Sequence, residues 1–303
     1  MKRPPQIGWL ADGRRLHLQD GPIDLIVEAR GSSETNLRTA YRAAARRFTG
    51  LLDELCDELP LLRQAADPAK CLLEGRVARR MHAAVAPLAA DHFITPMAAV
   101  AGSVAEEILG AMLHEASLHR AYVNNGGDIA LHLAGDEQFK VGLVDRPDQF
   151  GLMRTVTIDA RDPSRGVATS GRHGRSFSLG IADAVTVLAR TAAQADAAAT
   201  IIANAVDLPG HPAIIRCPAE QLQPDSDLGA RLVTRNVGPL GECEIASALE
   251  AGSGKARALF AAGLIDGAVL HLQGQTRLVA LKSLAASVGQ AARLPESESA
   301  VYA

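Results

Sequence analysis

Side chains that could do chemistry are concentrated between Gly166 and Asn204. We expect Thr169, Ser170 and Gly171 to form a hydroxyl-bearing turn, which is followed by three basic residues: Arg172, His173 and Arg175. Guanidinium groups pair with phosphate or carboxylate oxygens through two parallel hydrogen bonds, so both arginines are candidate anion contacts. The neighbouring cations favour a neutral imidazole that accepts protons, as a general base must. The alternative for the histidine is a loop side chain that hydrogen-bonds the backbone.

A carboxylate and a hydroxyl follow within the same stretch. Asp196 and Thr200 are four residues apart in an alanine-rich segment, 192–206, which we expect to be helical. This spacing places both oxygens on one helix face, one turn apart, where they form a metal-capable pair. The alternative is an exposed helical carboxylate and a hydroxyl bonded to its own helix.

Two further positions are candidates. The turn predicted at Asn125, Gly126, Gly127 and Asp128 permits positive φ and frees backbone N–H groups, which suits contact with phosphate or ribose. It suits an ordinary hairpin equally well. Asp183, directly before the apolar run 184–189, either orients an arginine or ends a turn.

The elements that must position these residues follow from hydrophobic periodicity. Alternating residues at 7–29 predict an opening meander, and Ser32 or Ser33 is expected to cap one long helix that Pro60 closes. Further helices are expected at 73–86, 98–116, 192–206 and, on both sides of an interruption at 252–254, at 244–262. Strands are expected at 91–97, 121–123, 129–134, 139–144, 153–158, 184–189, 233–237, 267–272 and 276–281.

Strand groups alternating with single long helices predict an α+β fold with mixed or antiparallel sheets and packed helices. We expect one domain over 1–289, with two subdomains at 1–145 and 146–289 as the alternative, and a frayed polar tail at 290–303.

Composition excludes some classes of protein. The net charge of −3 and the pI near 6.3 give no global basic footprint, so we expect no nucleic-acid partner. No apolar run approaches the roughly 18 residues of a membrane helix, and no secretory signal is apparent, so we expect a cytoplasmic protein without a membrane partner. The four cysteines are widely spaced and form no C-x-x-C pair, so we expect reduced, mostly buried thiols. A homo-oligomer remains compatible with the sequence.

Three motifs occur in a fixed order: Asn125-Gly126-Gly127-Asp128-Ile129, Ala168-Thr169-Ser170-Gly171 and Ala195-Asp196-Ala197-Ala198-Ala199-Thr200. Together they resemble the ApbE superfamily, whose best-known members are Mg-dependent FAD:protein FMN transferases. The sequence around these motifs looks closer to an uncharacterised branch of that superfamily than to the transferases.

The resemblance implies an ApbE-like α+β fold with a flavin-dinucleotide site, for FAD or FMN, between the 125–128 and 169–171 motifs. It assigns Mg²⁺ to Asp196 and Thr200 and cofactor contacts to the two motifs. On the residue chemistry given above, Arg172 and Arg175 are further candidate cofactor contacts, and His173 and Asp183 are the candidate catalytic residues. Oxygen donors fit a hard cation that keeps some waters and bridges phosphates.

Three departures bear on the activity. The transferases carry a Ser-His-x-x-Asp-Pro segment, and the corresponding interval here reads Ser176-Phe177-Ser178-Leu179-Gly180-Ile181-Ala182-Asp183, with neither the histidine nor the Asp-Pro. Their lysine before a helix glycine is replaced by Ala101, and we expect no lipoprotein or periplasmic signal before the domain. The hypotheses are therefore a flavin-binding, transferase-like protein capable of FMN transfer or FAD pyrophosphate cleavage, an enzyme of small-molecule catabolism acting on a carboxylated or phosphorylated metabolite, and a non-catalytic ligand-binding module.

Overall fold

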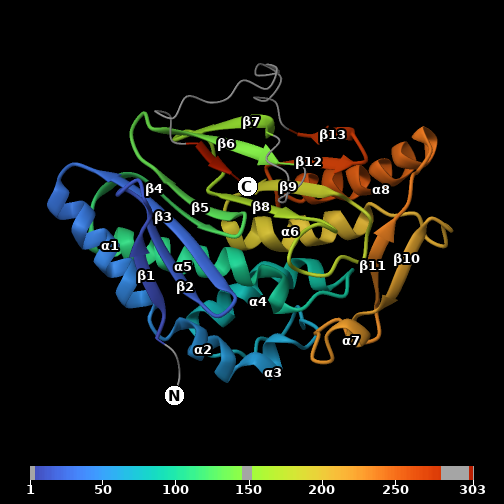
Figure 1. Cartoon of the computed structure of the whole chain (residues 1–303), viewed down its shortest axis with the longest axis horizontal. Coiled ribbons are helices and arrows are strands. Elements are labelled where there is room, and N and C mark those ends of the chain that lie inside the picture. Colours follow the sequence, from blue (N-terminus) through green and yellow to red (C-terminus); the bar gives the residue numbers. More distant parts are fainter. Residues whose placement is uncertain (1–3, 145–151, 281–299, 303) are drawn as a thin grey trace.

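The computed structural model describes residues 4–144, 152–280 and 300–302. Its main feature is a nine-stranded sheet (Figure 1). In spatial order the strands are β1 (Gln6–Trp9), β2 (Leu16–Asp20), β3 (Ile23–Gly31), β4 (Leu118–Asn125), β5 (Asp128–Leu133), β8 (Gly166–Ser170), β9 (Ala184–Ala189), β12 (Gly267–Leu272) and β13 (Gln275–Val279). All neighbouring strands are antiparallel, and the meander expected at 7–29 is confirmed as β1 to β3.

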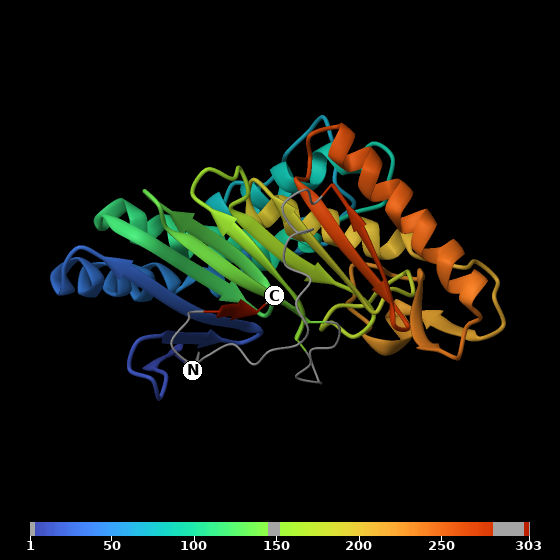
Figure 2. The same cartoon turned by 90° about the horizontal axis from the view of Figure 1, so that it is seen from above.

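Helices cover one face of this sheet. The helices of the described residues are α1 (Glu34–Phe48), α2 (Leu51–Asp57), α3 (Leu59–Leu62), α4 (Arg76–Ala89), α5 (Val100–Glu115), α6 (Ala192–Ala205), α7 (Ala219–Leu222), α8 (Glu242–Ala261) and the 3₁₀ helix η1 (Pro96–Ala99). Helices α1, α5 and α6 lie directly beneath the strands, and α8 packs against β12 and β13 (Figures 1 and 2). The predicted α+β class with antiparallel sheets and packed helices is confirmed.

A second, three-stranded sheet covers the opposite face of the main sheet. Strands β6 (Gln138–Val144) and β7 (Leu152–Asp159) are antiparallel, and β14 (Ala300–Tyr302) runs parallel to β6. Phe139 and Ile158 of this sheet share an apolar cluster with Ile129 and Leu131 of β5. The strand expected at 139–144 therefore forms a separate sheet, instead of continuing the antiparallel set of 121–134. Residues 300–302 are paired rather than frayed, and 290–299 lie outside the described residues.

The segment expected to be one helix up to Pro60 is divided into three. Ser33 caps α1 as predicted, because its side chain accepts the N–H of Asn36. Gly50 has a φ of +84°, a conformation that no helix continues, so α1 ends and α2 begins there. Pro60 lies in the first turn of α3, where its missing N–H costs no helical hydrogen bond.

Three other expectations are wrong. The cysteines are not mostly buried: Cys56, Cys71 and Cys243 are exposed, and Cys217 is half-buried. Residues 91–97 form no strand, because Pro96 opens the 3₁₀ helix that leads directly into α5. Gly252 does not interrupt α8, which runs unbroken from Glu242 to Ala261. A Cβ at Gly252 would lie 2.3 Å from Cγ2 of Val206, so the small residue lets the helix approach the core.

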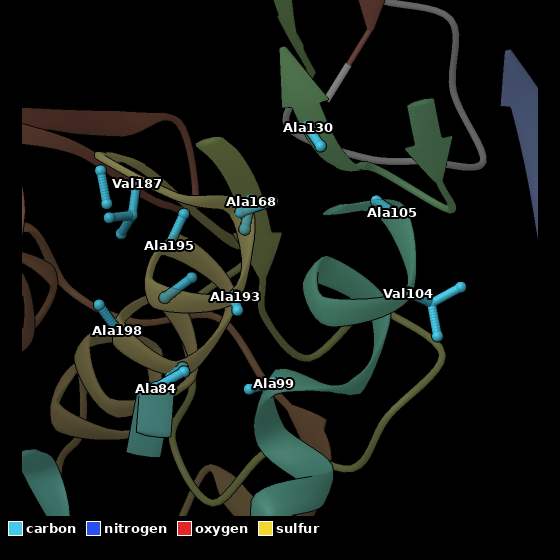
Figure 3. Packing of buried hydrophobic residues seen from close by; sticks show 14 of the residues in the cluster. Ala84, Ala99, Val104, Ala105, Ala130, Ala168, Val187, Ala193, Ala195 and Ala198 are labelled. Atoms are coloured by element: carbon cyan, nitrogen blue, oxygen red, sulfur yellow. The ribbon is translucent and has the colours of Figure 1, made fainter. Parts of the chain in front are cut away.

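Helix α5 is the central helix of the helical layer. Together with η1 it forms the continuous stretch Pro96–Glu115, which is long and apolar enough for a membrane span by length and composition alone. This comes closer to a span than the sequence led us to expect. Of its most apolar window, 56% is buried inside the fold. Small side chains gather around α5 and α6, with Ala99 and Ala105 on one side and Ala193, Ala195 and Ala198 on the other (Figure 3).

Strands β10 (Ile214–Pro218) and β11 (Leu232–Val237) form a separate two-stranded ribbon. The sequence predicted β11 and missed β10, which lies in a stretch that looked like a polar connector. The ribbon holds the loop after β8, because Arg216 donates to the carbonyl oxygen of Leu179 at 2.7 Å. The N–H of Thr234 donates to the carbonyl oxygen of Ser178 at 2.8 Å.

Candidate functional site

The 125–128 motif is a two-residue hairpin between β4 and β5. Asn125 and Asp128 are paired across the ladder, and the residues between them, Gly126 and Gly127, have φ values of +64° and +111°. The side chain of Asn125 donates to the carbonyl oxygen of Ala101 at 3.2 Å, which ties the hairpin to the start of α5. The motif is thus a hairpin that also brings Asp128 towards the helical layer, and contact of its residues with a ligand stays a prediction.

The start of α5 crosses the start of α6 at backbone contact. A Cβ at Gly102 would lie 2.3 Å from the carbonyl oxygen of Ala192, so only glycine permits this approach. The N–H of Gly102 donates to Oδ2 of Asp196 at 3.0 Å. A carboxylate is stabilised at this position because the first N–H groups of a helix lack helical partners and carry partial positive charge.

Asp128 and Asp196 are thereby brought together. Both side chains are half-buried by surface area, yet protein atoms enclose them deeply. Burial raises the pKa of Asp196 to about 7, against the hydrogen bonds from Gly102 and Ala101. Burial and then repulsion from Asp196 raise the pKa of Asp128 well above its ordinary value, against the N–H of Thr169 and the charge of Arg175. These two acids are costly to ionise together.

The donor set fits a hard divalent cation. Two carboxylates supply oxygen and negative charge, and Thr200 adds a half-buried hydroxyl one turn along α6 from Asp196. Within the residues that the structure describes, no group of three or more His, Cys, Asp or Glu side chains is placed to hold a metal ion by itself. The remaining ligands would therefore be water, hydroxyl, carbonyl or ligand oxygens, as Mg²⁺ prefers when it bridges phosphates.

The second motif is the end of a strand and not a turn, contrary to our expectation. Thr169 and Ser170 complete β8, and the hydroxyl groups of Thr169 and Thr186 are 2.8 Å apart across the β8–β9 ladder. A Cβ at Gly171 would lie 2.4 Å from the carbonyl oxygen of Asp183, so the chain can turn there only with glycine. The backbone N–H of Thr169 still reaches Asp128, which joins this motif to the carboxylate pair.

Arg172, His173 and Asp183 form a cluster beside the site. The carboxylate of Asp183 is 8% exposed and accepts from Nε of Arg172 at 2.8 Å and from the N–H of Gln273 at 2.6 Å. Nε2 of His173 lies 3.3 Å from the same carboxylate. Of the two alternatives for Asp183, the geometry favours orientation of an arginine. The catalytic roles of His173 and Asp183 stay predictions, as does the anion contact of Arg172.

Arg175 is the cation that the loop brings to the carboxylate pair. It is exposed, its Nη1 donates to the carbonyl oxygen of Pro22 at 3.3 Å, and its Nη2 lies 3.0 Å from where a Cβ of Gly126 would be. The side chain therefore lies across the hairpin turn, with the charge that acts on Asp128.

Sequence reasoning missed two residues that build this site, Gly102 and Glu106. Gly102 donates to Asp196, and Glu106 accepts from the N–H of Ala193 in α6 at 2.7 Å. The glycine near the start of an apolar helix, followed four residues later by a carboxylate, was the available signal.

Comparisons with known proteins agree with the motifs. A family profile described as "AbpE bacteria" matches residues 7–278. A protein named "UPF0280 protein" from Methanopyrus kandleri is 34% identical over 180 residues, which cover 59% of this chain and 69% of the relative. Another from Methanococcoides burtonii is 34% identical over 170 residues, which cover 53% of this chain and 65% of the relative. For a third, from Methanothrix thermoacetophila, the chain spans 46% of the relative's length at 39% identity.

Among solved structures, the apo form of Pseudomonas stutzeri flavinyl transferase ApbE aligns over 93% of this chain and 97% of that chain. Its identity is 12% and its TM-score is 0.48, a likeness too distant to bear on function. The family match covers most of the sequence and includes all three motifs. The chain therefore belongs to the ApbE-like family that the "AbpE bacteria" profile describes, as the motifs predicted.

Proposed function

We propose that this protein binds a flavin nucleotide, or a similar anionic small molecule, together with one divalent cation held by Asp128 and Asp196. The observation that carries the proposal is the enclosure of these two carboxylates with hydrogen bonds from backbone N–H groups. Enclosed carboxylates that repel each other are relieved when a cation binds between them.

The surroundings of the pair support an anionic partner for that cation. The glycine turn at 126–127 exposes backbone to ligand, and the guanidinium of Arg175 lies across it. A divalent cation that bridges phosphates, with an arginine on the outer side, is a common arrangement for holding a pyrophosphate. The choice of a flavin within this class rests on the three motifs shared with the FAD:protein FMN transferases.

When bound, the cation would neutralise a pyrophosphate and stabilise the charge that develops during phosphoryl transfer. The contributions of this chain would be to hold the cation on Asp128 and Asp196 and to orient phosphate oxygens with Arg175. Such a site suits FMN transfer or FAD pyrophosphate cleavage. The histidine of the transferase segment is absent at 176–181, so His173 is the available base in this loop.

A second candidate is an enzyme that acts on a carboxylated or phosphorylated metabolite at the same site. One observation favours it: Nε2 of His173 lies 3.3 Å from Oδ1 of Asp183. A buried carboxylate this close to an imidazole helps to orient the ring, as a general base requires. For either candidate, we propose a cytoplasmic protein whose partner is a small molecule.

The first test is the absorption spectrum of the purified protein, followed by thermal shifts with FAD, with Mg²⁺ and with both. We expect FAD plus Mg²⁺ to raise the melting temperature more than the sum of the two separate shifts. Asp128→Asn and Asp196→Asn should lose this synergy, whereas Asp136→Asn, which changes an exposed turn carboxylate, should keep it. Absence of any shift in the wild-type protein contradicts the proposal.

Two observations distinguish the second candidate from the first: which ligand stabilises the protein, and whether His173 acts as a base. If phosphorylated or carboxylated metabolites stabilise the protein and FAD does not, the metabolite enzyme is favoured. Turnover of such a ligand should then fall by about 10²–10⁴-fold in His173→Ala, as for loss of a general base. Retention of full turnover in that variant contradicts a role for His173 as base.

A further inference from the structure

Where helices α5 and α6 cross, a carboxylate of each helix accepts a hydrogen bond from a backbone N–H group of the other. Asp196 of α6 accepts the N–H of Gly102 near the start of α5 at 3.0 Å. Glu106, one turn further along α5, accepts the N–H of Ala193 near the start of α6 at 2.7 Å. Each helix thus supplies the cap of the other, and both caps lie next to the contact between Gly102 and Ala192.

Glu106 serves a donor that the local cap does not reach. Thr191 caps α6 by accepting the N–H of Gln194, whereas Glu106 reaches Ala193 from another helix. Because N–H groups in the first turn of a helix have no helical acceptor, loss of Glu106 would leave the N–H of Ala193 without this partner. A carboxylate is also favoured at this end by the helix dipole.

The side chain of Glu106 is itself held in place. Its other oxygen lies 3.3 Å from Nε of Arg80, and its side chain is 20% exposed. Arg80 is fixed in turn, since it donates to Glu107 at 2.9 Å and to the carbonyl oxygen of Ser103 at 3.1 Å. Glu106 can therefore act as a rigid link between α4, α5 and the start of α6.

We propose that Glu106 is the positioning residue of the cation site: by capping α6 at Ala193 it fixes the direction in which Asp196 faces Asp128. This inference rests on the proposed cation binding. Asp196 is three positions beyond Ala193, less than one helical turn, so a tilt or rotation of the α6 start moves the Asp196 carboxylate with it. Glu106 does not bind the cation; it acts through the helix that carries a ligand.

The test is a titration of each purified protein with Mn²⁺ alone, followed by the electron paramagnetic resonance signal of free Mn²⁺. For Glu106→Ala we expect the dissociation constant to rise about 10–100-fold, the usual effect of losing a residue that orients a metal ligand. Glu106→Gln should keep most of the affinity, because its amide oxygen can still accept from Ala193. Glu115→Ala, which removes an exposed carboxylate from the end of the same helix, should bind as wild type does.

Each outcome decides the matter. If Glu106→Ala does not fold, Glu106→Asp takes its place, since its carboxylate is one methylene too short to reach Ala193. Unchanged Mn²⁺ affinity in the folded Ala or Asp variant overturns the inference while leaving the proposed cation site intact. A Gln variant as weak as the Ala variant also overturns it, because charge rather than the hydrogen bond would then be responsible. Failure of wild-type protein to bind Mn²⁺ removes the proposed function and this inference together.

Discussion

Two acidic sites, Glu107 in α5 and the pair formed by Asp128 and Asp196, differ in how their negative charge is compensated. The side chain of Glu107 is 2% exposed and accepts from Arg47 at 2.8 Å and from Arg80 at 2.9 Å. Burial alone would raise the pKa of Glu107, but these two arginines outweigh it and lower the pKa. Asp128 and Asp196 instead receive backbone N–H groups, and burial raises the pKa of both.

The difference separates an acid that stabilises the fold from a pair that can bind a ligand. Glu107 already has its cations, so a metal ion would have to displace arginines. The aspartate pair has negative charge without an equal positive charge in contact, which is the condition for binding a cation. Arg175 only partly offsets this charge from its exposed position over the hairpin.

Removal of Glu107 should have the largest effect. Glu107→Ala removes the carboxylate that Arg47 and Arg80 share and leaves them with Glu54 and Glu106. We expect a loss of about 1–3 kcal/mol in unfolding free energy. Urea denaturation measures this loss, and added Mg²⁺ should not restore it. Recovery of stability with Mg²⁺ would mean that Glu107 belongs to the cation site and that the two acidic sites are not distinct.

Removing the charge of one member of the aspartate pair should instead increase the unfolding free energy. Asp128→Asn removes the repulsion between the carboxylates, so the protein free of metal should gain about 1–2 kcal/mol at pH 8. The same variant should lose stabilisation by Mg²⁺. Urea denaturation with and without Mg²⁺ measures both effects, and destabilisation of the metal-free variant would contradict the repulsion.

The pH dependence follows from the raised pKa of Asp196. Because its pKa rises from 3.8 in the unfolded chain to about 7 in the fold, folding takes up a proton between these values. This contribution to stability is fully present below pH 3.8, falls as the pH rises, and is absent above about pH 7. Stabilisation by Mg²⁺ should therefore be larger at pH 8 than at pH 5, where protons compete for the carboxylates. Melting temperatures measured with and without Mg²⁺ at pH 5 and at pH 8 test this prediction. Equal Mg²⁺-induced shifts at the two pH values would contradict it.

The smallest effect is expected at the hairpin. Gly126→Ala must adopt a φ of +64°, which costs about 1 kcal/mol, and its Cβ would press on the mobile end of Arg175. We expect a small loss of stability and a modest weakening of ligand binding. Gly135→Ala, also at positive φ but with open space around the Cβ, is the matched control for the backbone cost. Equal effects of the two variants on ligand binding would exclude a role for the contact with Arg175.

Sequence periodicity predicted most elements because their apolar faces are local properties of the chain. It failed where a single backbone angle or a distant partner decides the outcome. Gly50 ends the first helix because its φ is positive. Gly252 stays helical within α8, where the absence of a Cβ leaves room for the side chain of Val206. Neither fact can be obtained from composition near those residues.

The candidate site was predicted as separate motifs but not as an electrostatic pair. Asp128 and Asp196 were assigned to different roles, and their mutual repulsion emerges only when the hairpin meets α6. Glu106 and Glu107 resembled two ordinary carboxylates on a helix, because the arginines that distinguish them come from α1 and α4. The residue roles in ligand binding and catalysis, and the domain boundaries at 1–289, stay predictions.

One measurement tests the central claim most directly: the number of Mn²⁺ ions bound per chain at pH 8, for wild type, Asp196→Asn and Asp136→Asn. We predict one ion for the wild type and for Asp136→Asn, and none at the same concentrations for Asp196→Asn. A wild-type protein that binds no Mn²⁺, or an Asp196→Asn variant that binds it equally well, would contradict a cation site built on the enclosed aspartate pair.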